Sequence, residues 1–174
     1  MAITKTLNDQ TGFTELMFRQ ANTKDATALT KLSFDSKGYW DYPGSYFNIW
    51  ADELTVSTEY IKNNDVQVYT IWDSIAAYYS IVKLDNDIEI GGVLLNSGNW
   101  LEHMFVTPQH IGSGIGAKLF SHLRQRSLER GIVELGILAD PNAKGFYLKM
   151  GCVYVKEYPS TIKNRTTPYL KLKL

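Results

Sequence analysis

Residues 100–138 constrain the fold of this chain more than any other segment. The β-rich run WLEHMFVT leads into the turn PQHIGSGIG, a helix-periodic segment and a second apolar run, IVELGILA. A strand, a helix and a strand in this order predict two parallel strands joined by a right-handed crossover. Glycines occupy alternate positions 112, 114 and 116, where the first strand gives way to the helix. The helix therefore begins at a turn with an unusually bare and permissive backbone.

The runs on either side of this unit extend the prediction to the rest of the chain. Before it, we expect a strand at 16–21, a capped helix at 22–34, short helices at 45–54 and 57–63, and an antiparallel meander over 65–107 that includes 88–95 as one strand. After it, we expect a helix at 141–150 and closing strands at 152–158 and 168–174. This order predicts an α/β (α+β mixed) fold with a mixed, mostly antiparallel twisted sheet of about seven strands and about four flanking helices.

Composition limits the partners that the chain can have. The 174 residues suffice for one domain, and we assign residues 1–12 to a polar N-terminal tail and 13–174 to a single domain. Lys and Arg together number 18, as do Asp and Glu, so no global basic field attracts nucleic acid or acidic lipid. No apolar run approaches the length of a membrane span. The single cysteine, Cys152, cannot pair within the chain, which predicts a cytoplasmic protein. It lies in an apolar run, which predicts a buried thiol.

The glycine turn favours a phosphate-bearing ligand. A helix N-terminus carries unpaired amides and a partial positive charge, and glycines let a phosphate approach them closely, with Ser113 and Lys118 as helpers. A tight turn with no ligand is the alternative, but three alternating glycines exceed what a turn needs. The turn lacks the Gly-Lys-Ser/Thr of a Walker loop, and the acidic residue that closes the second strand of a dinucleotide fold is missing. A nucleotide-dependent enzyme is therefore the less favoured reading.

Two segments together resemble a known family. LEHMFVTPQHIGSGIGAKLF is similar to the strand, proline turn, Gly-x-Gly loop and helix of the GNAT superfamily of N-acetyltransferases, and ILADPNAKGFYLKMGC is similar to its second signature. The resemblance extends over nearly the whole chain from about residue 16. It implies acetyl-CoA (coenzyme A) as the donor, an amine as the acceptor, and a V-shaped opening between the splayed parallel strands 100–107 and 132–139. Such domains often pair, so a homodimer is compatible with the sequence.

The resemblance also implies where the cofactor lies. Pantetheine is expected along main-chain groups near Phe105 and Val106, and the pyrophosphate on amides of residues 112–117. The family usually has Gln or Arg where this chain has Ile111, so one side-chain contact to phosphate is missing, which affects affinity rather than chemistry. The implied cofactor-binding residues are Phe105, Val106, Ile111, Gly112, Ser113, Gly114, Ile115, Gly116, Ala117, Asn142 and Tyr147.

Tyr147 is the expected catalytic acid, because it occupies the position of the family's usual tyrosine. A phenol stays protonated at neutral pH and can give its proton to a leaving thiolate. The alternative is that Tyr147 packs like its neighbour Phe146. We expect no metal site, because His110 and His122 have no acidic or cysteine cluster near them in the sequence.

Glu102 is the expected catalytic base, acting directly or through water. Strict alternation places it on one face of its strand with the apolar residues Trp100, Met104 and Val106. Apolar surroundings make a carboxylate a better proton acceptor near neutral pH. A surface carboxylate paired with a lysine is the alternative for Glu102. His103, which alternation places on the opposite face with Leu101 and Phe105, is the alternative base.

The aromatic segment GYWDYPGSYFNIW predicts the wall of an acceptor pocket. The candidates are Trp40, Tyr42, Tyr46 and Phe47, with Asp41 placed to steer a cationic amine, although each ring alone is better explained by capping the sheet. For Arg165 the sequence leaves three alternatives: contact with an acceptor carboxylate, contact with a CoA phosphate, or exposure to solvent. We predict an acyltransferase of class EC 2.3.1.- that passes acetyl directly to a primary amine of a small molecule or peptide. The alternative is a non-catalytic CoA-binding sensor or partner module.

Overall fold

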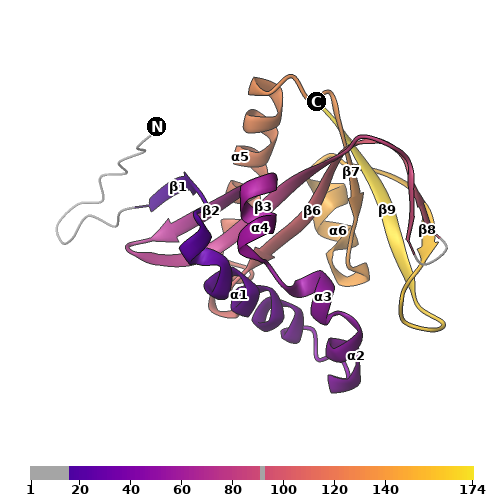
Figure 1. Ribbon diagram of the computed structural model, residues 1–174, viewed down its shortest axis with the longest axis horizontal. Helices are drawn as coiled ribbons and strands as arrows, with labels where there is room; N and C mark the ends of the chain where they lie inside the picture. The colour runs from indigo at the N-terminus through magenta and orange to yellow at the C-terminus, as the bar shows by residue number, and fades with distance from the viewer. Residues whose placement is uncertain (1–15, 91–92) are drawn as a thin grey trace.

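One twisted sheet organises the molecule. The computed structural model describes residues 16–90 and 93–174, and within them seven strands form a sheet in the order β1-β2-β3-β6-β7-β9-β8 (Figure 1). Neighbouring strands pair antiparallel except β6 and β7, which are parallel. The strands are β1 (Leu16–Gln20), β2 (Asp65–Ile71), β3 (Ser74–Leu84), β6 (Gly98–Val106), β7 (Glu134–Leu138), β8 (Val153–Pro159) and β9 (Thr166–Lys173).

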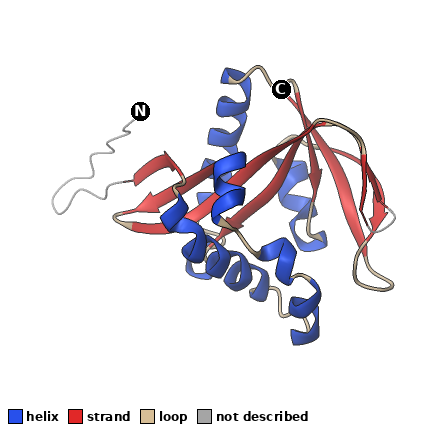
Figure 2. Cartoon of the chain, in the orientation of Figure 1, coloured by secondary structure: helices blue, strands red, loops and turns tan. Residues whose placement is uncertain are grey.

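Helices cover both faces of this sheet (Figure 2). Helices α5 and α6 pack on one face, and α1 and α4 pack on the other. None of the helices in the described part of the chain is long and apolar enough to cross a membrane. The helices are α1 (Ala26–Gly38), α2 (Gly44–Ile49), α3 (Ala51–Leu54), α4 (Thr58–Asn63), α5 (Ile115–Glu129) and α6 (Lys144–Lys149), with 3-10 turns η1 (Thr23–Asp25), η2 (Pro108–His110) and η3 (Pro141–Ala143).

Local sequence signals set the ends of these helices. The Asn22 side chain accepts from the amide of Lys24, and Asp25 reaches back to the Asn22 amide at 2.8 Å, so a capping box starts the first helical segment. Ser57 caps α4 by accepting from the amide of Tyr60 at 3.0 Å. Gly131 follows α5 with a φ of +70°, the left-handed conformation that glycine adopts most easily.

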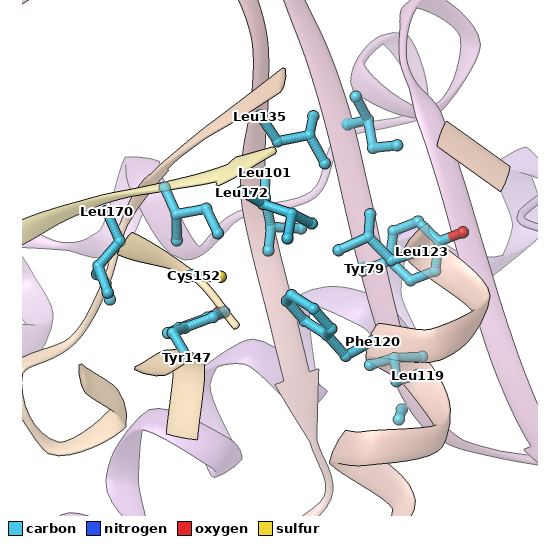
Figure 3. Packing of buried hydrophobic residues seen from close by; sticks show 14 of the residues in the cluster. Tyr79, Leu101, Leu119, Phe120, Leu123, Leu135, Tyr147, Cys152, Leu170 and Leu172 are labelled. Atoms are coloured by element: carbon cyan, nitrogen blue, oxygen red, sulfur yellow. The ribbon is translucent and has the colours of Figure 1, made fainter. Parts of the chain in front are cut away.

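The core between the sheet and α5 is the largest of the three buried clusters in the described residues (Figure 3). Ile115, Leu119 and Leu123 form an apolar stripe along α5, and Phe120 joins them in the buried cluster. Burying each such side chain contributes about 1.5–3 kcal/mol. This packing fixes the start of α5 against the ends of the central strands.

The predicted fold class is confirmed, with one correction in the meander. Residues 88–95 were expected to form a single strand between β3 and β6. Instead, β4 (Ile88–Ile90) and β5 (Val93–Leu95) pair with each other as a separate ribbon, and residues 91–92 lie outside the described residues. Strands β3 and β6 are long enough to pair directly from Ala77–Val106 to Leu84–Gly98, which leaves no place between them. The proposed tail, residues 1–12, also lies outside the described residues.

Candidate active site

Strands β6 and β7 diverge soon after they meet. They pair only at Trp100–Gly136 and Leu101–Ile137, after which β6 continues to Val106 without a β7 partner in the register of the described strands. Gly136 allows the close approach, because a Cβ at this position would lie 2.6 Å from the Trp100 indole. Phe105 and Val106 lie on the diverging stretch, where one backbone edge of β6 is open to a ligand.

The turn before α5 leads into a helix start whose backbone amides have no partner within the helix. Gly112 and Gly114 have φ values of +82° and +87°, and a Cβ at either would meet nothing within 4 Å. Gly114 is the N-cap and supplies no side-chain bond to the helix. The backbone bond from Lys118 N to Gly114 O begins the helical ladder, so the amides of residues 115–117 precede it. An anion can therefore reach this helix end, which includes the candidates Ile115 and Ala117.

The other predicted cofactor-binding residues of this segment make contacts within the protein. A Cβ at Gly116 would lie 3.4 Å from the Phe146 ring, so this glycine permits close packing of α5 against α6 rather than opening the rim. The Ser113 hydroxyl donates to the His110 carbonyl oxygen at 2.7 Å. The Ile111 amide donates to the Pro108 carbonyl oxygen at 3.2 Å, and its side chain is half-buried. Of the three glycines, only Gly112 and Gly114 therefore leave open space beside the start of α5.

Tyr147 lies within the main core, next to the diverging strands. Its side chain is 7% exposed and contacts Phe120 and Phe146 edge-on, and Figure 3 shows it beside Cys152. Burial raises the pKa of Tyr147, and the nearby Cys152 and Asp140 raise it further. Burial likewise raises the pKa of the Cys152 thiol to about 11. Tyr147 therefore stays protonated at neutral pH, and Cys152 is the buried thiol that the sequence predicts.

Glu102 does not lie in the apolar surroundings that alternation predicted. A β-bulge falls here: Ser80 pairs with His103 and Ile81 with Leu101, so Glu102 is the extra residue on β6. The bulge changes the phase of the strand. Leu101 packs on the α5 side, whereas Glu102 is exposed and accepts a hydrogen bond from the Tyr60 hydroxyl of α4 at 2.5 Å. The predicted face of Glu102 is therefore wrong.

His103 is buried, and one of its ring nitrogens is hydrogen-bonded. It does not share the face of Leu101, but it lies 5.2 Å, ring to ring, from Tyr60 and 5.8 Å from Phe105. Its Nε2 is 2.9 Å from the carbonyl oxygen of Glu53. Burial lowers the pKa of His103, although the charges of Glu102 and Glu53 act in the opposite direction. A neutral ring enclosed in this way is less suited to collect a substrate proton than the exposed Glu102.

On the other side of the divergence, Asp140 gathers polar groups from three distant segments. We call Asp140, Lys37, Tyr42, Asn142 and Arg165 the Asp140 cluster. Asp140 accepts from the Lys37 ammonium at 2.7 Å, the Tyr42 hydroxyl at 2.7 Å and Arg165 at 3.2 Å. The amide of Asn142 donates to it at 2.9 Å, and the Asn142 side chain donates to the Tyr42 hydroxyl at 2.8 Å. The predicted cofactor residue Asn142 is thus bonded to the aromatic segment.

The Asp140 cluster holds its carboxylate in the ionised form. Burial alone would raise the pKa of Asp140, but the charge and hydrogen bond of Lys37, with those from Asn142 and Tyr42, lower it overall. The Tyr42 hydroxyl responds in the opposite direction, since burial and its bond to Asp140 raise its pKa. A carboxylate stabilised in this way is a poor proton acceptor at neutral pH.

Trp50 organises the aromatic segment. Rings of Tyr42, Tyr46 and Phe47 meet it at centroid distances of 5.2, 5.4 and 5.9 Å, and Lys37 lies 4.4 Å above its ring. Trp40 is separate: it contacts Tyr39 and is 37% exposed. Three of the four predicted acceptor-site rings are therefore brought together, and the fourth is not.

Sequence reasoning missed Tyr60, Lys37 and Asp140 as site residues. The one local signal for Asp140 is the string Asp-Pro-Asn, in which Asp140 caps the following turn. Tyr60 lies in the short helix predicted at 57–63, but no sequence pattern connects it with the site. Its hydrogen bond to Glu102 on β6 can be predicted only when the bulge is known.

The chain matches a family model and many solved structures. Residues 51–168 match the model described as acetyltransferase (GNAT) domain. No curated protein sequence matches the chain. Similar structures include a GCN5-related N-acetyltransferase from Rhodopseudomonas palustris (18% identity, TM-score 0.69, covering 100% of this chain and 99% of that one). Another is the PaiA N-acetyltransferase of Thermoplasma acidophilum with coenzyme A (12% identity, TM-score 0.69, covering 92% of this chain and 99% of that one). A third is a Brucella melitensis GNAT acetyltransferase with acetyl-CoA (17% identity, TM-score 0.60, covering 91% of this chain and 88% of that one).

Proposed function

Because this chain belongs to the acetyltransferase (GNAT) family, we propose that it transfers an acetyl group from acetyl-CoA directly to a primary amine of a small molecule or peptide. The observation that carries the proposal is the divergence of β6 from β7 beside an uncapped α5 N-terminus. An open strand edge and open helical amides are the two features that a long ligand with a diphosphate requires.

The residues present fit coenzyme A. The open edge at Phe105 and Val106 offers backbone groups to an amide-bearing arm, and the rim at Gly112 and Gly114 has room for a diphosphate. Ile111 offers no polar side chain there, so binding relies on backbone amides. When bound, acetyl-CoA supplies an acetyl group activated as a thioester.

We assign one proton transfer to Tyr147 and the other to Glu102. The buried phenol of Tyr147 stays protonated and is the donor for a leaving thiolate. The exposed carboxylate of Glu102 accepts the proton that the acceptor ammonium must lose. Because Cys152 is buried and its pKa is raised, transfer to the amine without an acyl-cysteine intermediate is the simplest route.

The test is a screen of acetyl-CoA turnover against a broad amine library, read as release of free thiol. We expect amine-dependent release by the natural chain and a fall of about 100-fold in Tyr147→Phe, with coenzyme A affinity nearly unchanged. Tyr158→Phe is the matched control, because its hydroxyl bonds the distant Leu94 carbonyl oxygen. Coenzyme A binding with no thiol release for any amine would contradict the proposal and support a non-catalytic CoA-binding module.

A further inference from the structure

A chain of hydrogen bonds runs beneath β6 and ends at Glu102. The backbone amide of His103 donates to Ser80 Oγ at 3.1 Å, Ser80 Oγ lies 2.6 Å from the Tyr60 hydroxyl, and Tyr60 donates to Glu102 Oε2 at 2.5 Å. We propose that Tyr60 is a positioning residue that aims the Glu102 carboxylate and keeps it ionised for proton transfer from the acceptor. The inference rests on the proposed function, in which Glu102 is the base.

The three hydrogen bonds of this series all donate in the same direction, toward Glu102. Ser80 Oγ accepts from the His103 amide, so its own proton points to the Tyr60 oxygen, and the single proton of Tyr60 goes to Glu102. Burial raises the pKa of Tyr60, and the charge of Glu102 with the bond to it raises it further, so the phenol remains a donor. An ionised carboxylate only accepts hydrogen bonds, which suits the end of such a chain.

Both partners of this bond are held in place by their backbones. The bulge on β6 turns Glu102 toward α4, and the Ser57 cap fixes the amide of Tyr60 at 3.0 Å. The Tyr60 carbonyl oxygen accepts from the Asn64 amide at 3.1 Å, which fixes the other end of the helix. The exposed Glu102 uses only Oε2 in bonds within residues 16–90 and 93–174, so Oε1 is left for a substrate ammonium.

Titratable groups from four elements meet around Glu102. Tyr60 comes from α4, Tyr78 from β3 and His103 from β6, and Glu53 of α3 contributes its carbonyl oxygen and its charge. Burial raises the pKa of Tyr78 and lowers the pKa of His103, so both stay neutral. Ionisation of these two groups therefore does not account for a change in the pH profile when the Tyr60 hydroxyl is lost.

The test compares kcat/KM against pH, with one acceptor amine, for the natural chain and Tyr60→Phe. Without the donor, the ionised carboxylate is less stable, so the acidic limb should move up by about 1 pH unit. Because the carboxylate is also no longer aimed, the maximum should fall about 10-fold. Tyr78→Phe is the matched control: it removes another buried hydroxyl of the same region, bonded to Ser33 rather than to Glu102, and should not move the limb. Glu102→Gln should lose about 100-fold or more of the activity.

The outcomes separate this inference from the proposed function. An unmoved limb in a folded Tyr60→Phe protein, or an equal shift in Tyr78→Phe, overturns the positioning role while amine-dependent turnover stands. If the natural chain releases no thiol with any amine, both proposals fail together. Should Tyr60→Phe not fold, Ser80→Ala carries the test. It removes the donor behind Tyr60 and should shift the limb in the same direction by a smaller amount, whereas no shift overturns the role.

Discussion

Two carboxylates stand on either side of the point where β6 and β7 part, and their surroundings are opposite. Glu102 is the first residue of β6 beyond the last pair, Leu101–Ile137, and it is exposed with one phenol as its donor. Asp140 lies three residues past that pair on the β7 side, with a side chain only 12% exposed and two cations against it. The same functional group is thus exposed with one hydrogen-bond donor on one side and is held as a largely buried anion on the other.

The difference follows from which segments each carboxylate joins. Glu102 is reached by one neighbouring helix, so its removal leaves no charge stranded in the core. Asp140 joins the end of α1, the aromatic segment and the loop between β8 and β9, through Lys37, Tyr42 and Arg165. Removing its charge leaves two largely buried cations without their anion, which is the costly case for ion pairs.

The largest expected effect is therefore on stability, in Asp140→Asn. This change keeps the shape of the side chain but removes its charge, and it should lower the free energy of unfolding by about 3–5 kcal/mol. Glu102→Gln is the matched control and should change stability by about 0.5 kcal/mol or less. Urea unfolding followed by Trp fluorescence measures both. Equal losses in the two variants would contradict the comparison.

The sequence predicted the elements around both carboxylates but not their surroundings. Period, caps and glycines located β6, α5 and α6, because these signals are local. The face of Glu102 was wrong because one bulge residue shifts the alternation, and the string LEHM carries no mark of it. The Asp140 cluster was invisible because Lys37 and Arg165 lie 103 and 25 residues away from Asp140. Such partners are chosen by the packing of the whole chain.

The pH dependence of stability provides the next test. The folded pKa of Asp140 is lowered, so its contribution is present above the unfolded pKa of about 3.9 and is lost as pH falls through the folded value. Asparagine resembles the protonated form, so the stability curves of the natural chain and Asp140→Asn should converge below about pH 4. Asp65, whose pKa burial would raise but Arg126 and Gln67 lower, should weaken both proteins equally. Curves that stay parallel down to acid would show that the charge of Asp140 is not what stabilises the fold.

The smallest expected effect on stability distinguishes the contributions of the two cations that contact Asp140. Arg165 is 3.2 Å from Asp140 and stacks on Tyr42 and Trp50 at 5.2 and 5.3 Å, whereas Lys37 is closer to the carboxylate, at 2.7 Å. Because Lys37 still neutralises the anion, Arg165→Gln should lower the free energy of unfolding by only about 1 kcal/mol.

A double-mutant cycle of Arg165→Gln with Asp140→Asn isolates this pair. In the Asp140→Asn background the guanidinium has lost its anion, so removing it should cost less than in the natural chain, and the coupling should be about 1 kcal/mol. A coupling near zero would mean that Arg165 contributes through its aromatic contacts alone. In that case the anion on the β7 side depends on Lys37, and its contrast with Glu102 rests on one buried ion pair rather than two.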